Sequence, residues 1–194
     1  MKHSLRALPL AALALSALTL TPLAQAADPA ALKQEAVANI KAFGGTLKGE
    51  LVAAMKAGGP VNAIGVCNEK APAIAASLSS PQGWTVARTS LKVRNTGNTP
   101  DAWEQAVLAR FEERKAAGED PDTLAFAEVV DRDGHKEYRF MKAIPTGEVC
   151  LKCHGAAIDP AVEAKLKVLY PDDKARGYAV GDLRGAFTLR KPVN

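Results

Sequence analysis

The sequence has few of the residues that most often carry chemistry. Its 194 residues include three cysteines, three histidines and three methionines, and aromatic side chains make up 5%. No basic cluster with interleaved aromatics is present, which argues against nucleic-acid binding. Beyond residues 7–20 there is no long apolar run, so no further membrane span is expected. The odd number of cysteines also excludes a scheme in which every cysteine pairs within the chain.

The first 26 residues have the three parts of a secretory signal peptide. Lys2 and Arg6 are positively charged, residues 7–20 are apolar, and Ala24-Gln25-Ala26 has the small-x-small pattern that signal peptidase cleaves. The apolar run is short for a transmembrane helix, which needs roughly 20 residues. We therefore predict cleavage after Ala26, export to the periplasm, and a single domain over residues 27–194 with no stable membrane span.

The apolar pattern predicts helices first and mostly antiparallel strands afterwards, which indicates an α+β domain. A first helix is expected from Pro29 to Met55, with Gly58-Gly59-Pro60 ending it, and a second from Val61 to Ser79. Pro72 should kink or restart the second helix just after Cys67. The other expected elements are a strand at 84–93, a helix after the cap Thr99, a hairpin of 126–130 with 135–144, a helix at 159–169 and a strand at 183–189.

One short motif stands out: Cys150-Leu151-Lys152-Cys153-His154 has the C-x-x-C-H pattern of covalent haem c attachment. Two intervening residues allow the two thiols to reach vinyl groups on neighbouring pyrroles. The histidine that follows then lies under the ring, where its imidazole can bind the iron. Attachment of this kind takes place outside the cytoplasm, which agrees with the signal peptide. We predict one covalent haem c on Cys150 and Cys153, with His154 as an axial ligand.

Three other uses of these cysteines fit the motif less well. A thioredoxin-like redox pair leaves the trailing histidine unexplained. A zinc site of three cysteines and one histidine has the right number of ligands, but the adjacent Cys153 and His154 point apart and chelate one tetrahedral ion poorly. A structural disulfide accounts for neither the spacing nor His154.

The residues alone leave the second axial position open. The candidates are His135, Met55, Met141, Cys67, a lysine or no ligand at all, because haem iron accepts imidazole, thioether and thiolate. His135 follows an Asp-Gly turn and is expected to be solvated. The methionines and Cys67 can equally be apolar packing residues. Residue types place Cys67 slightly ahead of the two methionines.

Several segments resemble those of a family of exported single-haem c-type proteins with a PAS-like fold, long known only as a domain of unknown function. The family also provides the input regions of some sensor kinases. The matching segments span nearly all of residues 27–194 and are Ala63–Asn68, Leu91–Asn95, Thr99–Glu104, Cys150–Gly155 and Gly181–Ala186. The resemblance implies a PAS-like antiparallel sheet flanked by N-terminal helices, with the C-x-x-C-H segment as its haem loop. It further implies that Cys67 ligates the iron opposite His154. Thr96-Gly97 departs from the pattern, since a proline is expected near that turn.

These features predict a redox-active, cytochrome-like protein for electron transfer or redox response, with an unknown redox partner. The alternative is a haem-based gas or redox sensor module acting through a partner protein. We do not expect an enzyme, because a peroxidase needs a distal acid or base and His135 is the spare imidazole. Cationic side chains, Arg94 above all, are predicted near the haem propionates, although they could equally form a solvated strand face.

Overall fold

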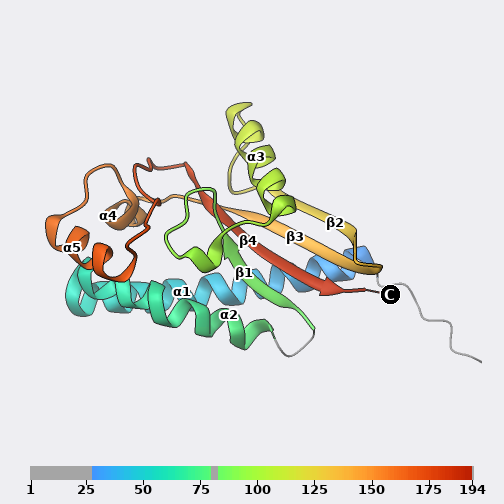
Figure 1. Ribbon diagram of the computed structural model, residues 1–194, viewed down its shortest axis with the longest axis horizontal. Coiled ribbons are helices and arrows are strands. Elements are labelled where there is room, and N and C mark those ends of the chain that lie inside the picture. Colours follow the sequence, from blue (N-terminus) through green and yellow to red (C-terminus); the bar gives the residue numbers. More distant parts are fainter. Residues whose placement is uncertain (1–27, 80–82, 194) are drawn as a thin grey trace, which may run out of the picture.

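A computed structural model describes residues 28–79 and 83–193 of the chain. Its centre is a four-stranded antiparallel sheet in the order β1-β4-β3-β2 (Figure 1). The strands are β1 Thr85–Thr89, β2 Ala125–Arg132, β3 His135–Pro145 and β4 Leu183–Pro192. The helices are α1 Pro29–Gly65, α2 Ala71–Ser79, α3 Ala102–Ala116, α4 Leu151–His154 and α5 Pro160–Leu169, with short turns η1 Val66–Lys70, η2 Thr96–Asn98 and η3 Glu148–Cys150. The α+β class is thus confirmed, and the PAS-like arrangement stays a prediction.

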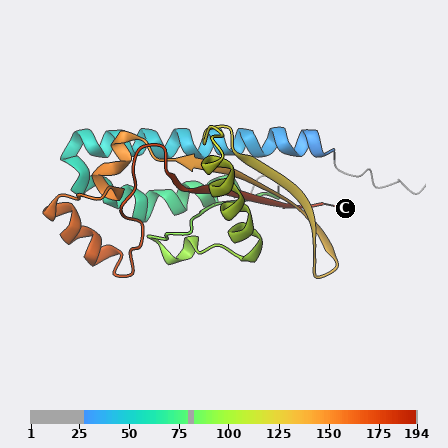
Figure 2. The same cartoon turned by 90° about the horizontal axis from the view of Figure 1, so that it is seen from above.

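Successive side chains of a strand point to opposite faces of the sheet. Both faces of this sheet have apolar side chains, and helices cover each of them. Helix α1 runs along one face, as Figure 2 shows, and α2 lies beside it; α3 packs on the other face. The cluster on the α1 side contains Leu32, Ala36, Ile40, Phe43, Trp84, Val86, Tyr138, Phe140 and Leu189. The cluster on the α3 side contains Val107, Leu108, Phe111, Leu124, Met141, Ala143, Leu183 and Ala186.

The predicted end of the first helix at Gly58-Gly59-Pro60 is confirmed. Gly58 and Gly59 leave the helical conformation, with φ values of −160° and 68°, and a second helix begins at Pro60, so α1 contains two helices that meet at this turn. The ion pair of Lys70 with Glu50 joins residues 20 apart in sequence, because the second helix runs back along the first. The kink predicted just after Cys67 is confirmed, since Val66–Lys70 forms a π-helical turn. Pro72 explains this local change, because it has no N–H to donate to the Asn68 carbonyl.

Two boundaries differ from prediction. Helix α3 is capped by Asp101 and not by Thr99, because Asp101 and Glu104 form a reciprocal capping box. Strand β1 ends at Thr89, well before residue 93, since the Ser90 hydroxyl bonds the backbone of Lys92 and turns the chain. The hairpin of β2 and β3 is confirmed, with positive φ at both residues of its turn, Asp133 and Gly134.

Helices α4 and α5 lie together at one end of the molecule, beside the C-terminal part of α1 (Figure 1). Ile64 of α1 packs there in a small cluster with Val162, Leu166 and Tyr170. Among the described residues, no helix has the length and apolar character needed to span a membrane. The predicted signal peptide lies outside the described residues.

Candidate functional site

The C-x-x-C-H segment is helical. Cys150 ends the 3₁₀ turn η3, and Leu151–His154 adds one α-helical turn. Residues three apart on a helix are neighbours, so this turn places Cys150 and Cys153 side by side. All three cysteines are free thiols and half-buried.

A loop that leads into β4 holds this segment in place. The Tyr178 N–H donates to the His154 carbonyl over 3.0 Å, and the Gly177 N–H donates to the Gly155 carbonyl over 3.1 Å. Ahead of the motif, Thr146 exchanges backbone hydrogen bonds of 2.8 Å with Gly181 and Asp182. The backbone around His154 is thereby fixed from both sides.

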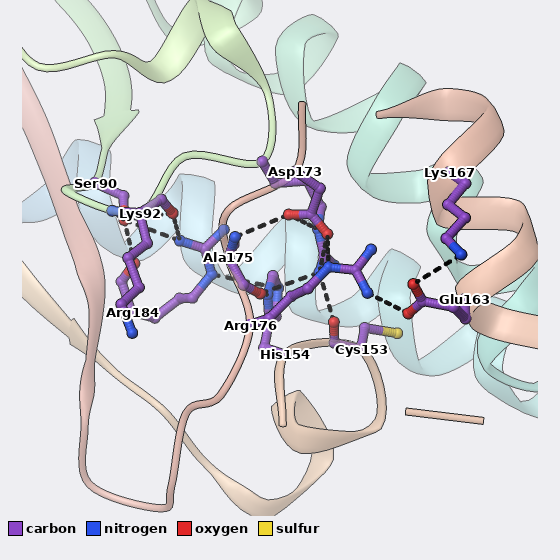
Figure 3. A network of polar contacts seen from close by, with 11 residues as sticks. Ser90, Lys92, Cys153, His154, Glu163, Lys167, Asp173, Ala175, Arg176 and Arg184 are labelled. Atoms are coloured by element: carbon purple, nitrogen blue, oxygen red, sulfur yellow. Dashed lines mark hydrogen bonds and ion pairs between the residues drawn. The ribbon is translucent and has the colours of Figure 1, made fainter. Parts of the chain in front are cut away.

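The His154 ring has a defined tautomer, because its two nitrogens have different partners (Figure 3). Nδ1 lies 2.8 Å from the Ala175 carbonyl oxygen, which can only accept, so Nδ1 carries the proton. Nε2 keeps its lone pair and accepts from Arg184 Nε at 3.3 Å. The pKa of His154 is lowered to about 3. Burial is the largest cause and the charges of Arg184 and Arg94 act in the same direction, while the Ala175 hydrogen bond and the charge of Asp173 oppose them. The imidazole is therefore neutral at pH 7 and can bind a metal through Nε2.

Cys67 lies near the motif, although the two are far apart in sequence. Cys153 packs against the cluster of Ile64 and Tyr170, and Ile64 stands about one helical turn before Cys67. The pKa of Cys153 is raised, first by burial and further by the charges of Cys67 and Cys150, against a lowering effect of Arg94. The π-helical turn therefore brings Cys67 to the same region as the two cysteines of the motif.

Arg88, Arg94 and Arg184 gather around these residues. The Arg88 guanidinium lies 5.5 Å from the centre of the Phe43 ring on the α1 face of the sheet. Burial lowers the pKa of Arg88, and the charges of Cys67 and Tyr170 oppose this. Burial also lowers the pKa of Arg184, whose Nη1 donates to Ser90 Oγ at 3.1 Å.

Arg94, which is predicted to lie near the haem propionates, is buried at the site and forms hydrogen bonds to other residues of the chain. Its Nε and Nη2 atoms each lie 3.0 Å from an Asp173 carboxylate oxygen, and Nη2 also donates to the Cys153 carbonyl at 2.6 Å. These bonds use Nε and Nη2, so Nη1 is the atom that a propionate could reach. A propionate contact of Arg94 stays a prediction.

Met141 and His135 lie away from the motif. Met141 is fully buried in the cluster under α3, and Met55 is half-buried three residues before the turn at Gly58. His135 is exposed at the first residue of β3, whereas the motif follows the last, Pro145. A strand of this length separates its ends by roughly 30 Å. Within residues 28–79 and 83–193, no three histidine, cysteine or acidic side chains are arranged to hold a metal ion directly, so the zinc alternative has no support.

Sequence reasoning did not find Arg184 or Ala175. Arg184 had a signal, since it lies in Gly181–Ala186, one of the segments that resembled the family. Ala175 had none, because it acts through a backbone carbonyl, which every residue possesses. The contact between that carbonyl and His154 depends on how the loop before β4 folds back over α4.

The comparisons with known proteins agree with this description. The Tll0287-like family model matches residues 11–192. The crystal structure of the cyanobacterial heme-protein Tll0287 superposes with a TM-score of 0.65 and 25% sequence identity, covering 86% of this chain and 97% of that one. No curated protein is significantly similar to the chain. The family resemblance inferred from the motifs is therefore confirmed, and the chain belongs to the Tll0287-like family.

Proposed function

We propose that this protein is an exported monohaem c-type cytochrome-like protein that serves electron transfer or redox response. Cys150 and Cys153 would bind the haem through thioether bonds, and His154 and Cys67 would be the two axial ligands of its iron. The observation that carries the proposal is the His154 tautomer, in which Nδ1–H donates to Ala175 and Nε2 presents its lone pair. The name of the structural relative, a cyanobacterial heme-protein, supports the same cofactor.

The thiols, the imidazole and the cationic side chains at this site fit haem c and its two anionic propionates. Two free thiols stand three residues apart on one helical turn, ahead of a neutral imidazole. Arg88 and Arg184 are half-buried cations beside them, and such groups are well placed to neutralise two anionic propionates. An iron ion at His154 Nε2 would take the place of the Arg184 hydrogen bond.

The haem would supply a one-electron Fe(III)/Fe(II) couple. The chain's own residues determine how that couple behaves. A thiolate from Cys67 would donate electron density and favour the ferric state, and His154 is held in one orientation by Ala175. If Cys67 and His154 both held the iron, a small molecule could bind it only by displacing one of them. This arrangement favours electron transfer over catalysis.

Expression with a cytochrome c maturation system and a pyridine haemochrome assay test the proposal. We expect one haem per chain that remains with the protein after acid–acetone extraction. Extraction of the colour into acetone would refute covalent attachment. Rapid mixing of the reduced protein with carbon monoxide then separates the functions: absence of fast binding supports electron transfer, and fast binding would favour the sensor module.

A further inference from the structure

Both backbone polar groups of Ala175, its N–H and its carbonyl, are hydrogen-bonded to side chains. Its N–H donates to Asp173 Oδ1 at 2.9 Å. Its carbonyl accepts from His154 Nδ1 at 2.8 Å and from Arg94 Nη2 at 3.1 Å. Ala175 is fully buried, so water does not compete for that oxygen. Two donors, one of them a cation, therefore share the acceptor that orients the candidate iron ligand.

Arg94 and Asp173 form a buried bidentate ion pair, with side chains 8% and 2% exposed. Through its bonds to the Cys153 and Ala175 carbonyls, Arg94 also joins α4 to the loop before β4. Burying two charges costs several kcal/mol per ion, and well-packed apolar residues are often as stable. Stability alone is therefore a weak reason for this pair.

Resting on the function proposed above, we infer that Arg94 and Asp173 are positioning residues that tune the reduction potential of the iron through Ala175 and His154. The Arg94 guanidinium draws on the electron density of the Ala175 oxygen. This weakens the pull of that oxygen on the Nδ1 proton of His154. The imidazole then has less anionic character and donates less to ferric iron, so the potential is higher than it would be without Arg94.

The decisive variant is Arg94→Lys in the haem-loaded protein. A lysine keeps the positive charge, but its compact ammonium cannot bond Asp173 bidentately and also reach the Cys153 and Ala175 carbonyls. Ala175 would then accept more strongly from His154, so the midpoint potential should fall at constant charge. The ¹H NMR resonance of the His154 Nδ1–H should shift with it.

Asp173→Asn should act in the opposite direction. The amide oxygen of asparagine still accepts from the Ala175 N–H, but the charge that balances Arg94 is gone. An uncompensated cation near the iron disfavours the ferric state, so the potential should rise. If the Arg94→Lys protein does not retain haem, the potential of Asp173→Asn tests the inference instead.

Arg176→Gln is the matched control. Arg176 Nε bonds Asp173 Oδ2 at 3.0 Å within the same network, but Arg176 bonds neither the Ala175 nor the Cys153 carbonyl. It should shift the potential less than either variant and leave the Nδ1–H resonance unchanged. Wild-type potentials in both Arg94→Lys and Asp173→Asn would overturn the inference. A wild-type protein without covalent haem would instead refute the proposed function, which the haemochrome assay detects separately.

Discussion

Thr188 Oγ1 donates a hydrogen bond of 2.7 Å to Oε1 of Glu104, which joins the centre of β4 to the first turn of α3. The same carboxylate oxygen accepts from Arg139 Nη2 at 3.2 Å. Asp101 adds a second ion pair to Arg139 at 2.7 Å. A buried polar network thus fastens α3 to the sheet, on the face opposite α1.

Glu104→Gln should destabilise the protein by about 2–3 kcal/mol, because loss of one partner leaves Arg139 buried with less compensation. The value lies at the low end for a buried pair, since Asp101 still faces Arg139. Urea unfolding followed by circular dichroism measures it. The exposed Glu113→Gln on the same helix is the control and should change stability by less than about 0.5 kcal/mol. Equal stabilities of the two variants would contradict this role for Glu104.

Asp101 should account for part of the loss in the free energy of unfolding at low pH. Burial raises its pKa, but the hydrogen bonds from Arg139 and the Glu104 N–H and the charges of Arg139 and Arg132 lower it further, so the net shift is downward. The unfolded chain therefore binds a proton more readily than the folded protein. The stabilisation from Asp101 is present above its ordinary pKa near 3.9 and is lost as pH falls through the lower folded value.

Asp101→Asn isolates this effect, because asparagine is an equally good N-cap. The variant should be less stable than wild type at neutral pH, and the difference should shrink as pH falls below the ordinary aspartate pKa. Urea unfolding at several pH values provides the measurement. A difference that persists undiminished at low pH would show that the charge of Asp101 is not its source.

Gly185 allows β4 to pass close to β1. Its φ of 152° is one that L side chains rarely adopt, and a Cβ there would overlap the Thr89 carbonyl oxygen and lie 3.0 Å from Ser90 Cβ. Gly185→Ala should therefore cost roughly 2 kcal/mol or more. Gly45→Ala is a control of opposite sign, since a Cβ at this exposed helical position meets nothing within 4 Å. It should stabilise the protein by about 0.5–1 kcal/mol. Thermal unfolding of both variants tests the contrast.

The features that the sequence could predict are those with local signals. The C-x-x-C-H motif is contiguous, the Asp133-Gly134 turn has its own conformational signature, and Pro72 acts on the carbonyl four residues before it. The turn at Gly58-Gly59-Pro60 is a local signal of the same kind, and the first helix ends there as predicted. The place of the second helix depends on packing, since Ile64 contacts Val162 and Leu166.

The parts of the site that the sequence did not predict depend on contacts between residues that are far apart in the chain. Arg94 was chosen for its charge, but its carboxylate partner Asp173 lies in a loop without periodicity. Arg184 lies on the last strand and contacts His154, 30 residues away in sequence. Spacing along the chain has no information on such pairs.

Cys67→Ser tests the sixth ligand of the proposed haem. A serine hydroxyl is a weak donor, so the iron should become five-coordinate or bind water. The ferric absorption and EPR spectra should change from low spin to high spin. The potential should rise, because thiolate donation favours the oxidised state. The fold should persist, since Cys150, Cys153 and His154 still hold the haem.

Met55→Leu and Met141→Leu are the matched controls, because both methionines were candidates for the same position. Met141 is fully buried among the apolar residues under α3, and leucine has a similar volume, so its replacement should cost less than about 1.5 kcal/mol and leave the spectrum unchanged. Met55 is half-buried on α1 and should behave in the same way. A Cys67→Ser protein with the low-spin spectrum of wild type would refute ligation by Cys67. A change to high spin in either methionine variant would then identify the ligand, since removal of a thioether donor is the one feature that these substitutions share.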